Sequence, residues 1–134
     1  MKISIPVSVG ELVDKLTILD IKLENITDEN KLIHIRKEKE ELEKLYADFT
    51  EMQANRDVLY QINRGLWIVE DELRRKEKQQ EFDSDFVRLA RDVYHINDKR
   101  FEIKSKINIL TQSDIKEMKS YESYSWGLRK RVGR

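Results

Sequence analysis

Between Gly10 and Gly127 the chain contains a single glycine, Gly65, and no proline. Over the same stretch, apolar residues recur at intervals of three and four, the spacing that places them on one face of an α-helix. Few chain breakers and a sustained helical period predict helices. We therefore predict an all-α fold, namely an antiparallel helical bundle of about four long helices with coiled-coil-like seams and a short N-terminal extended segment.

The N-terminal segment alternates in polarity before the first helix begins. Its apolar residues Ile3, Ile5 and Val7 are separated by polar residues and Pro6, a pattern that predicts an extended segment confined by the proline to a sheet edge or a lead-in. Ser8 opens the sequence SVGE, which has the form of a capping box. The first helix is therefore expected to begin at this point.

The first helix carries a wide apolar stripe. Its seam consists of Leu12, Leu16, Leu19, Leu23 and Ile26, and further apolar residues widen it. A stripe of this width is buried from more than one side. Because three neighbouring helices of unequal length are expected to leave part of it uncovered, we predict a homo-oligomer, most simply a dimer.

Capping residues mark the turns between the later helices. In NITDEN, residues 25–30, either Thr27 or Asp28 is expected to cap the second helix. In QQEFDSD, residues 79–85, either Asp83 or Ser84 is expected to cap the last helix. The apolar seam that follows predicts a last helix of about 27 residues, roughly 40 Å long.

The periodic pattern slips in phase between Phe49 and Leu59, where TEMQ has the form of another capping box. We predict a helix break near residues 50–56. A single helix over residues 28–79 is the alternative, because no glycine or proline lies at the slip. Gly65, inside the helix that follows, costs about 1 kcal/mol relative to alanine. It indicates a closely approaching helix, room for Trp67, or a ligand against bare backbone.

Charge and composition restrict the class of protein. The chain has 26 Lys plus Arg and 26 Asp plus Glu, a balance that suits solvated helix faces and argues against a dedicated nucleic-acid-binding protein. The absence of cysteine excludes disulfides and thiolate zinc sites and fits a reducing compartment. Without a signal-peptide pattern or a long apolar run, we expect a cytoplasmic protein. It is expected to comprise a helical bundle domain, residues 1–112, and a basic-aromatic tail, residues 113–134.

The motifs of common catalytic and cofactor-binding sites are missing. Isolated glycines exclude nucleotide-binding loops and the GxSxG elbow. There are two histidines, His34 and His95, and Asp92-x-x-His95 is a single loose match to the di-iron repeat. Glu11 and Asp14 lie one turn apart, as in magnesium-type pyrophosphohydrolases, but such pairs arise by chance among 26 acidic residues. We therefore predict no catalytic residue, no metal site and no cofactor.

Polar residues interrupt the apolar patterns of the third and fourth helices, and they are the candidate ligand-binding residues. These are Glu70, Asp71, Arg91, Tyr94, Asn97, Asp98 and Arg100. The structural explanation is an ion-pair network in which Glu70 or Asp71 pairs with Arg91 or Arg100 and sets the helix register. The functional explanation is an anion pocket in which basic side chains bind a carboxylate or phosphate ligand.

The C-terminal sequence YESYSWGLRKRVGR interleaves aromatic residues with basic ones. The bases are Arg129, Lys130, Arg131 and Arg134. Such a tail can stack on nucleotides or settle at a lipid surface. More commonly the aromatic residues dock the terminus onto the body while the bases stay solvated. Nucleic acid is thus expected as a partner only through these bases.

Four blocks of the sequence carry a family resemblance: IPVSVGELVDKLTILDIKLENI, NRGLWIVEDELRRKE, ARDVYHINDKR and KSYES. Through them the chain resembles a family of small helical bacterial and phage proteins that is catalogued only as a domain of unknown function. The similarity extends to about Tyr121. The resemblance implies a link to surface-glycan metabolism, but it supplies no activity and no site residues.

These observations favour a protein of unknown function that acts as a non-catalytic, self-associating helical interaction module, with an unknown protein partner. The alternative is a small-ligand protein or enzyme that binds an anion, carboxylate or phosphate through the polar residues of the third and fourth helices. A third hypothesis is a nucleic-acid accessory protein that uses the tail. An interaction module requires an exposed apolar face, whereas an enzyme requires polar residues that converge on a cavity.

Overall fold

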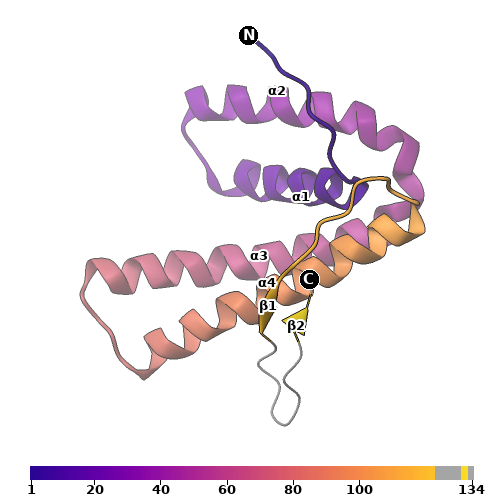
Figure 1. The fold of residues 1–134 in the computed structure, drawn as a ribbon. Coiled ribbons are helices and arrows are strands. Elements are labelled where there is room, and N and C mark those ends of the chain that lie inside the picture. The colour runs from indigo at the N-terminus through magenta and orange to yellow at the C-terminus, as the bar shows by residue number, and fades with distance from the viewer. Residues whose placement is uncertain (123–130, 133–134) are drawn as a thin grey trace.

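The computed structural model describes residues 1–122, 131 and 132 (Figure 1). The helices are α1 (Val9–Asn25), α2 (Glu29–Tyr46), the 3-10 helix η1 (Ala47–Met52), α3 (Gln53–Lys78) and α4 (Ser84–Leu110). Two short strands, β1 (Tyr121–Glu122) and β2 (Arg131–Val132), pair antiparallel. The predicted all-α class is confirmed, because every described element longer than two residues is a helix.

Side-chain caps begin three of the helices, as predicted. The Ser8 hydroxyl accepts a hydrogen bond from the Glu11 amide at 3.0 Å, although the Glu11 carboxylate bonds Lys104 instead of completing a capping box. Asp28 caps α2 and Asp83 caps α4. A cap requires only local sequence, and for this reason these helix starts are predictable.

The predicted break between the second and third helices is confirmed, but it begins at Ala47, earlier than expected. Phe49 leaves the helical conformation, with φ −130° and ψ 27°, and the chain reverses direction there (Figure 1). The alternative of one straight helix is therefore wrong. The second capping box is also wrong, because no side chain caps the start of η1 or α3. Because α2, η1 and α3 follow one another without a loop, they form one continuous helical stretch. Loops divide the described chain into three such stretches: α1, α2 to α3, and α4.

Helix α1 lies at the centre of the molecule and packs against α2, α3 and α4 (Figure 1). Most of its stripe is buried in a single chain: Leu12, Val13, Leu16, Leu19 and Ile21 are all at most 5% exposed, whereas Leu23 and Ile26 at its C-terminal end are half-buried. The chain itself therefore covers most of α1, and α1 gives little support to the argument that a second copy covers it. The dimer itself stays a prediction.

Helices α3 and α4 form a hairpin that is longer than α1, with 26 and 27 residues against 17. The hydrogen bonds and ion pairs between α1 and this hairpin involve positions 56–63 of α3 and 100–108 of α4. There the core is complete, and Leu59 and Ile107 are fully buried. The remainder, residues 68–95, extends past α1 and is called the distal hairpin below (Figure 1).

After α4 the chain folds back over the body through residues 113–119, called the strap below. The Ser113 hydroxyl accepts a hydrogen bond from the Val9 amide and donates one to the Ile115 carbonyl. These bonds anchor the strap beside the N-terminus of α1. The expected division of the chain at residue 112 stays a prediction.

No helix in the described part of the chain is both long enough and apolar enough to cross a membrane.

Candidate functional site

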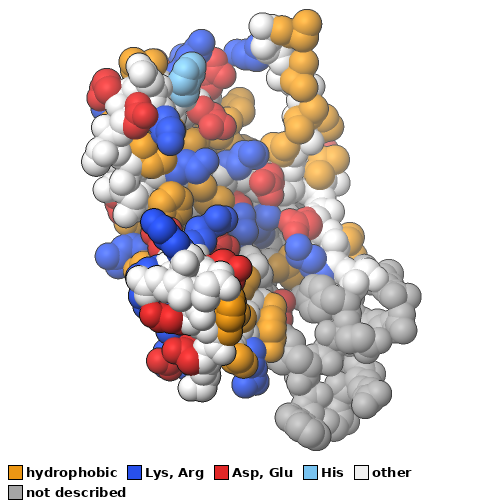
Figure 2. Space-filling view, turned by 90° about the vertical axis from the view of Figure 1, so that its left-hand side faces the viewer, with side chains coloured by type: hydrophobic (Ala, Val, Ile, Leu, Met, Phe, Trp, Pro, Cys, Tyr) orange, Lys and Arg blue, Asp and Glu red, His pale blue; other side chains and the backbone are white. Residues whose placement is uncertain are grey.

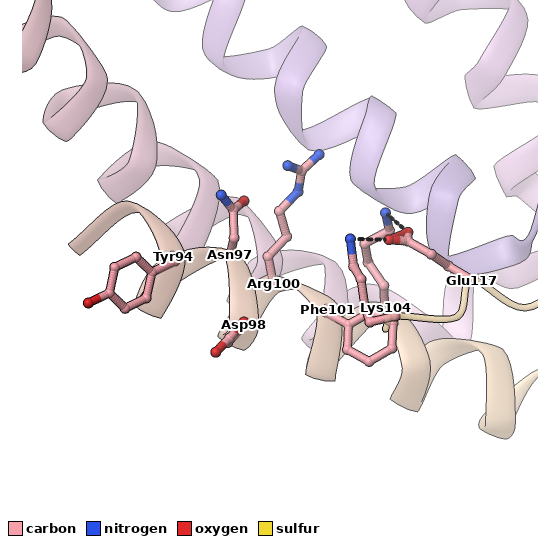
Figure 3. Close-up of a pocket in the computed structure, with 8 residues that line it drawn as sticks. Tyr94, Asn97, Asp98, Arg100, Phe101, Lys104 and Glu117 are labelled. Atoms are coloured by element: carbon pink, nitrogen blue, oxygen red, sulfur yellow. Dashed lines mark hydrogen bonds and ion pairs between the residues drawn. The ribbon is translucent and has the colours of Figure 1, made fainter. Parts of the chain in front are cut away.

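A pocket of about 450 Å³ lies along α4 at the strap (Figure 3). Its lining residues come from α4 and the strap, and they are Tyr94, Asn97, Asp98, Arg100, Phe101, Lys104, Glu117 and Lys119. Four of the seven predicted ligand-binding residues, Tyr94, Asn97, Asp98 and Arg100, are thus brought to one pocket. Tyr94, Asn97 and Asp98 lie three and four residues apart on one side of α4, whereas Arg100, two residues from Asp98, points toward α1 (Figure 3).

Behind the pocket, Arg100 reaches α1 and binds a fully buried carboxylate. Its guanidinium donates to both oxygens of Asp14, to Oδ1 at 2.9 Å and to Oδ2 at 2.5 Å. Asn63 of α3 donates to Asp14 Oδ1 and to the Thr17 hydroxyl, both at 2.9 Å. The hydrogen bond to Asp14 raises the pKa of Arg100 in spite of burial. The two-point contact of Arg100 joins α4 to α1, and the hydrogen bond from Asn63 adds α3, so three helices meet around one buried charge.

Lys104 forms a second junction one turn further along α4. Its ammonium donates at 2.8 Å to Glu11 of α1 and at 2.8 Å to Glu117 of the strap. Burial alone disfavours the charged form of Lys104, but the bonds to these two carboxylates outweigh it and raise its pKa. Lys104 therefore stays protonated and ties the strap to α1 and α4.

Glu117 receives two ammonium groups, because Lys119 also lies 2.8 Å from its carboxylate. Burial opposes ionisation of Glu117, yet the hydrogen bonds and charges of Lys104 and Lys119 lower its pKa to about 2. All three cations that line the pocket are thus engaged by carboxylates. Within the described residues, Asn97 and Asp98 make no hydrogen bond or ion pair, so they are the lining groups open to a ligand.

The other three predicted residues lie elsewhere. Arg91 is exposed and donates to the Tyr94 hydroxyl at 3.4 Å, and it does not line the pocket. Glu70 lines a different groove, on the distal hairpin, and Asp71 is exposed. The predicted pairing of Glu70 or Asp71 with Arg100 is wrong, because α1 crosses the hairpin at Arg100 and supplies Asp14 instead.

Several residues of this network were missed or set aside by the sequence analysis. Glu11 and Asp14 were treated as a chance pair, and Lys104 and Glu117 were not singled out. Asp14 carried a detectable signal, since an acidic residue between Val13 and Leu16 interrupts an apolar stripe. A buried carboxylate requires a cation, and Arg100 was the polar member of the facing seam.

In the described part of the chain, no group of three His, Asp or Glu side chains lies close enough together to hold a metal ion. His34 is exposed, and the His95 ring lies 4.8 Å from the ring of Tyr94. Arg129, Lys130 and Arg134 of the predicted basic tail lie outside the described residues, and for Arg131 the backbone strand pairing alone is described.

Comparison with known proteins identifies a family. The family described as "Family of unknown function (DUF6165)" matches residues 1–126. No curated protein and no solved structure matches the chain.

Proposed function

The chain belongs to this family of unknown function, and we propose that it is a non-catalytic helical interaction module that self-associates through the distal hairpin. The observation that carries the proposal is the incomplete burial of this hairpin. Its inward-facing apolar residues Val69, Leu73, Phe86, Leu89 and Val93 are only half-buried. In the part of the α3–α4 hairpin that contacts α1, by contrast, α1 completes the core. Two helices alone cannot enclose an apolar seam, so the distal hairpin has a face for a partner.

The open face contains a groove of about 380 Å³ between α3 and α4. Its apolar lining is Leu73, Phe86, Ala90 and Val93, and its charged lining is Glu70, Arg74 and Glu77. An apolar centre with a charged rim is the composition of a protein interface. Exposed Ile68, Phe82 and Val87 add apolar surface to the same hairpin.

A second copy is the partner this surface suits best. The rim carries both signs of charge, so two identical surfaces can oppose Arg74 of one copy to a glutamate of the other. Two distal hairpins packed together make an intermolecular four-helix contact, which differs from the four-helix bundle within one chain that the sequence predicts. A dimer formed in this way, in the cytoplasm, is the assembly we propose.

Equilibrium sedimentation of Ala90→Glu tests the proposal. The substitution places a charge at an exposed alanine that lines the apolar part of the groove. We expect the dimer dissociation constant to rise at least about tenfold, equivalent to about 1.4 kcal/mol. The matched control is Ala54→Glu, which makes the same change at an exposed alanine near the start of α3 and should leave dimerisation unchanged.

A wild-type protein that stays monomeric throughout the micromolar range contradicts the proposal. Equal weakening by Ala90→Glu and Ala54→Glu contradicts the assignment of the interface to the groove. Circular dichroism of both variants confirms that the helices remain formed.

The second candidate function is binding of a small ligand in the pocket on α4. It is favoured by the convergence of Tyr94, Asn97, Asp98 and Arg100 on that pocket. The pairing of its cations with carboxylates makes an anionic ligand less favourable than the sequence suggests. Thermal melts of wild type and Asn97→Ala in phosphate, sulfate and a dicarboxylate test this candidate, because a bound ligand raises the wild-type melting temperature selectively.

A further inference from the structure

Residues 2–7, called the arm below, extend from α1 beside α2 and are largely exposed (Figure 1). The polar contact described for their side chains is the ion pair of Lys2 with Glu41 at 3.2 Å. Ile3, Ile5 and Val7 are 77%, 71% and 39% exposed. Figure 2 shows the arm at the top of the molecule as a column of apolar side chains that stands apart from the body. Such a segment exposes apolar surface without a described partner.

The backbone of the arm is likewise unpaired within the described part of the chain. It makes no backbone hydrogen bond with any described residue. In an extended chain, successive N–H and C=O groups point alternately to the two edges, and side chains alternate between the two faces. The edge formed by Ile3, Ile5 and Val7 keeps all its donors, whereas the edge formed by Lys2, Ser4 and Pro6 lacks one. The edge formed by Ile3, Ile5 and Val7 therefore has a full set of backbone donors and acceptors available for pairing.

We propose that this edge pairs antiparallel with the same edge of a second copy, with the two-fold axis at Ile5. In that register Ile5 lies opposite Ile5, and Ile3 lies opposite Val7. Each of these pairs exchanges backbone hydrogen bonds. Pro6 falls opposite Ser4 in a non-hydrogen-bonded pair, where its missing N–H faces away from the partner.

The arm's own pattern identifies a second copy as the partner. The apolar residues at positions 3, 5 and 7 are symmetric about Ile5, so an antiparallel copy matches apolar to apolar at each position. The paired arms then present all these side chains on one face. The arm lines one side of a groove of about 870 Å³, in which Ile3, Ile5 and Val7 face the apolar residues Leu12, Leu42 and Leu45. This groove offers the combined face an apolar surface to cover.

The arm contact goes beyond the hairpin contact, because a different part of the molecule carries it. Each contact is self-complementary. Unless one two-fold axis passes through both, the two together join dimers into larger assemblies. Loss of one contact does not remove the other.

Disulfide trapping tests the register, and the absence of cysteine makes single-cysteine variants unambiguous. In Ile5→Cys the two cysteines face each other with Cα atoms about 5.5 Å apart, within the range that a disulfide spans. In the control Ser4→Cys, each cysteine meets its counterpart diagonally at about 7–8 Å, which a disulfide does not bridge without backbone movement. We expect Ile5→Cys to form covalent dimers at least about tenfold faster than Ser4→Cys under mild oxidation.

Equal rates in the two variants, or no covalent dimer in either, overturn the arm contact between two copies. The open edge of the arm would then suit a strand from a different protein. Repeating Ile5→Cys together with Ala90→Glu separates the two interfaces. Trapping that persists in this background supports the arm contact even if the hairpin contact fails. Trapping that is lost in it shows that the arms meet only as a result of hairpin dimerisation, which overturns an independent arm contact. Both cysteine positions lie outside the core, so neither substitution is expected to unfold the helices.

Discussion

Asp14 is fully buried, and its carboxylate is held by Arg100 and Asn63. Removing only the cation leaves a buried charge with an amide as its nearest donor, since the Lys104 ammonium is 4.0 Å away. We expect Arg100→Met to lower the free energy of unfolding by about 3–5 kcal/mol. Urea unfolding measures this loss.

The double variant Asp14→Asn, Arg100→Met is the control, because it removes the charge together with its partner. The new amide oxygen still accepts from Asn63, so most of the stability should return. If Arg100→Met alone is tolerated, the buried ion pair does not hold the helices together, and a hydrophobe of similar length replaces the arginine without loss.

The choice of Asp14 as the partner of Arg100 illustrates what the sequence alone cannot specify. The two residues are 86 positions apart, and their contact depends on the angle at which α1 crosses the α3–α4 hairpin. That α4 carries polar residues such as Tyr94, Asp98 and Arg100 beside its apolar seam was predictable, because it follows from the pattern within one element. Which carboxylate faces Arg100 depends on tertiary packing, and local pattern carries little information about that.

At the scale of elements, the surroundings of the glycines in α1 and α3 differ. A Cβ on Gly10 would lie 2.5 Å from the Lys104 carbonyl oxygen and 2.9 Å from Asn108 Oδ1, whereas a Cβ on Gly65 would meet nothing within 4 Å. We expect Gly10→Ala to cost about 1–3 kcal/mol by forcing α1 away from α4. Gly65→Ala should instead stabilise α3 by up to about 1 kcal/mol.

Thermal unfolding of the two variants checks this contrast, and each serves as the control for the other. Changes of the same sign in both would show that the approach of α1 to α4 at Gly10 is looser than described. Neither a closely approaching helix nor the Trp67 side chain explains Gly65, because a Cβ there would meet nothing within 4 Å; a ligand against bare backbone stays a prediction. Helix starts at Ser8, Asp28 and Asp83 were predictable, because each cap is local.

At the scale of the molecule, the sequence correctly predicts an all-α chain, but most of the α1 stripe from which a partner was inferred is covered by the chain itself. Apolar width made α1 the expected interface, yet α1 is the central helix and is covered by its own chain. The distal hairpin has an ordinary seam, and its exposure follows only from the difference in length between α1 and the hairpin. Periodicity reports that a face is apolar, but not which element covers it.

The strap links the stability of the whole molecule to pH through Glu117. Its pKa is lowered to about 2 by Lys104 and Lys119 against the opposing effect of burial. The folded state therefore binds this proton less readily than the unfolded state does. The contribution is present above pH about 4.5 and is lost as pH falls toward about 2. Glu117→Gln should thus reduce stability at pH 6 by about 1–3 kcal/mol, a range lowered for the solvent exposure of the side chain.

Urea unfolding of wild type and Glu117→Gln from pH 6 to pH 2 measures the difference, which should shrink across this window and vanish near its lower end. Glu102→Gln, an exposed neutralisation on the same stretch of α4, should give a much smaller difference. Other carboxylates also titrate in this range, including Asp83, whose pKa is lowered by its bond to the Phe86 amide and by Lys76. They affect wild type and variant alike, so the difference isolates the strap. A difference that stays constant from pH 6 to pH 2 would mean that Glu117 contributes through packing, and that its ion pairs with Lys104 and Lys119 do not hold the strap to the helices.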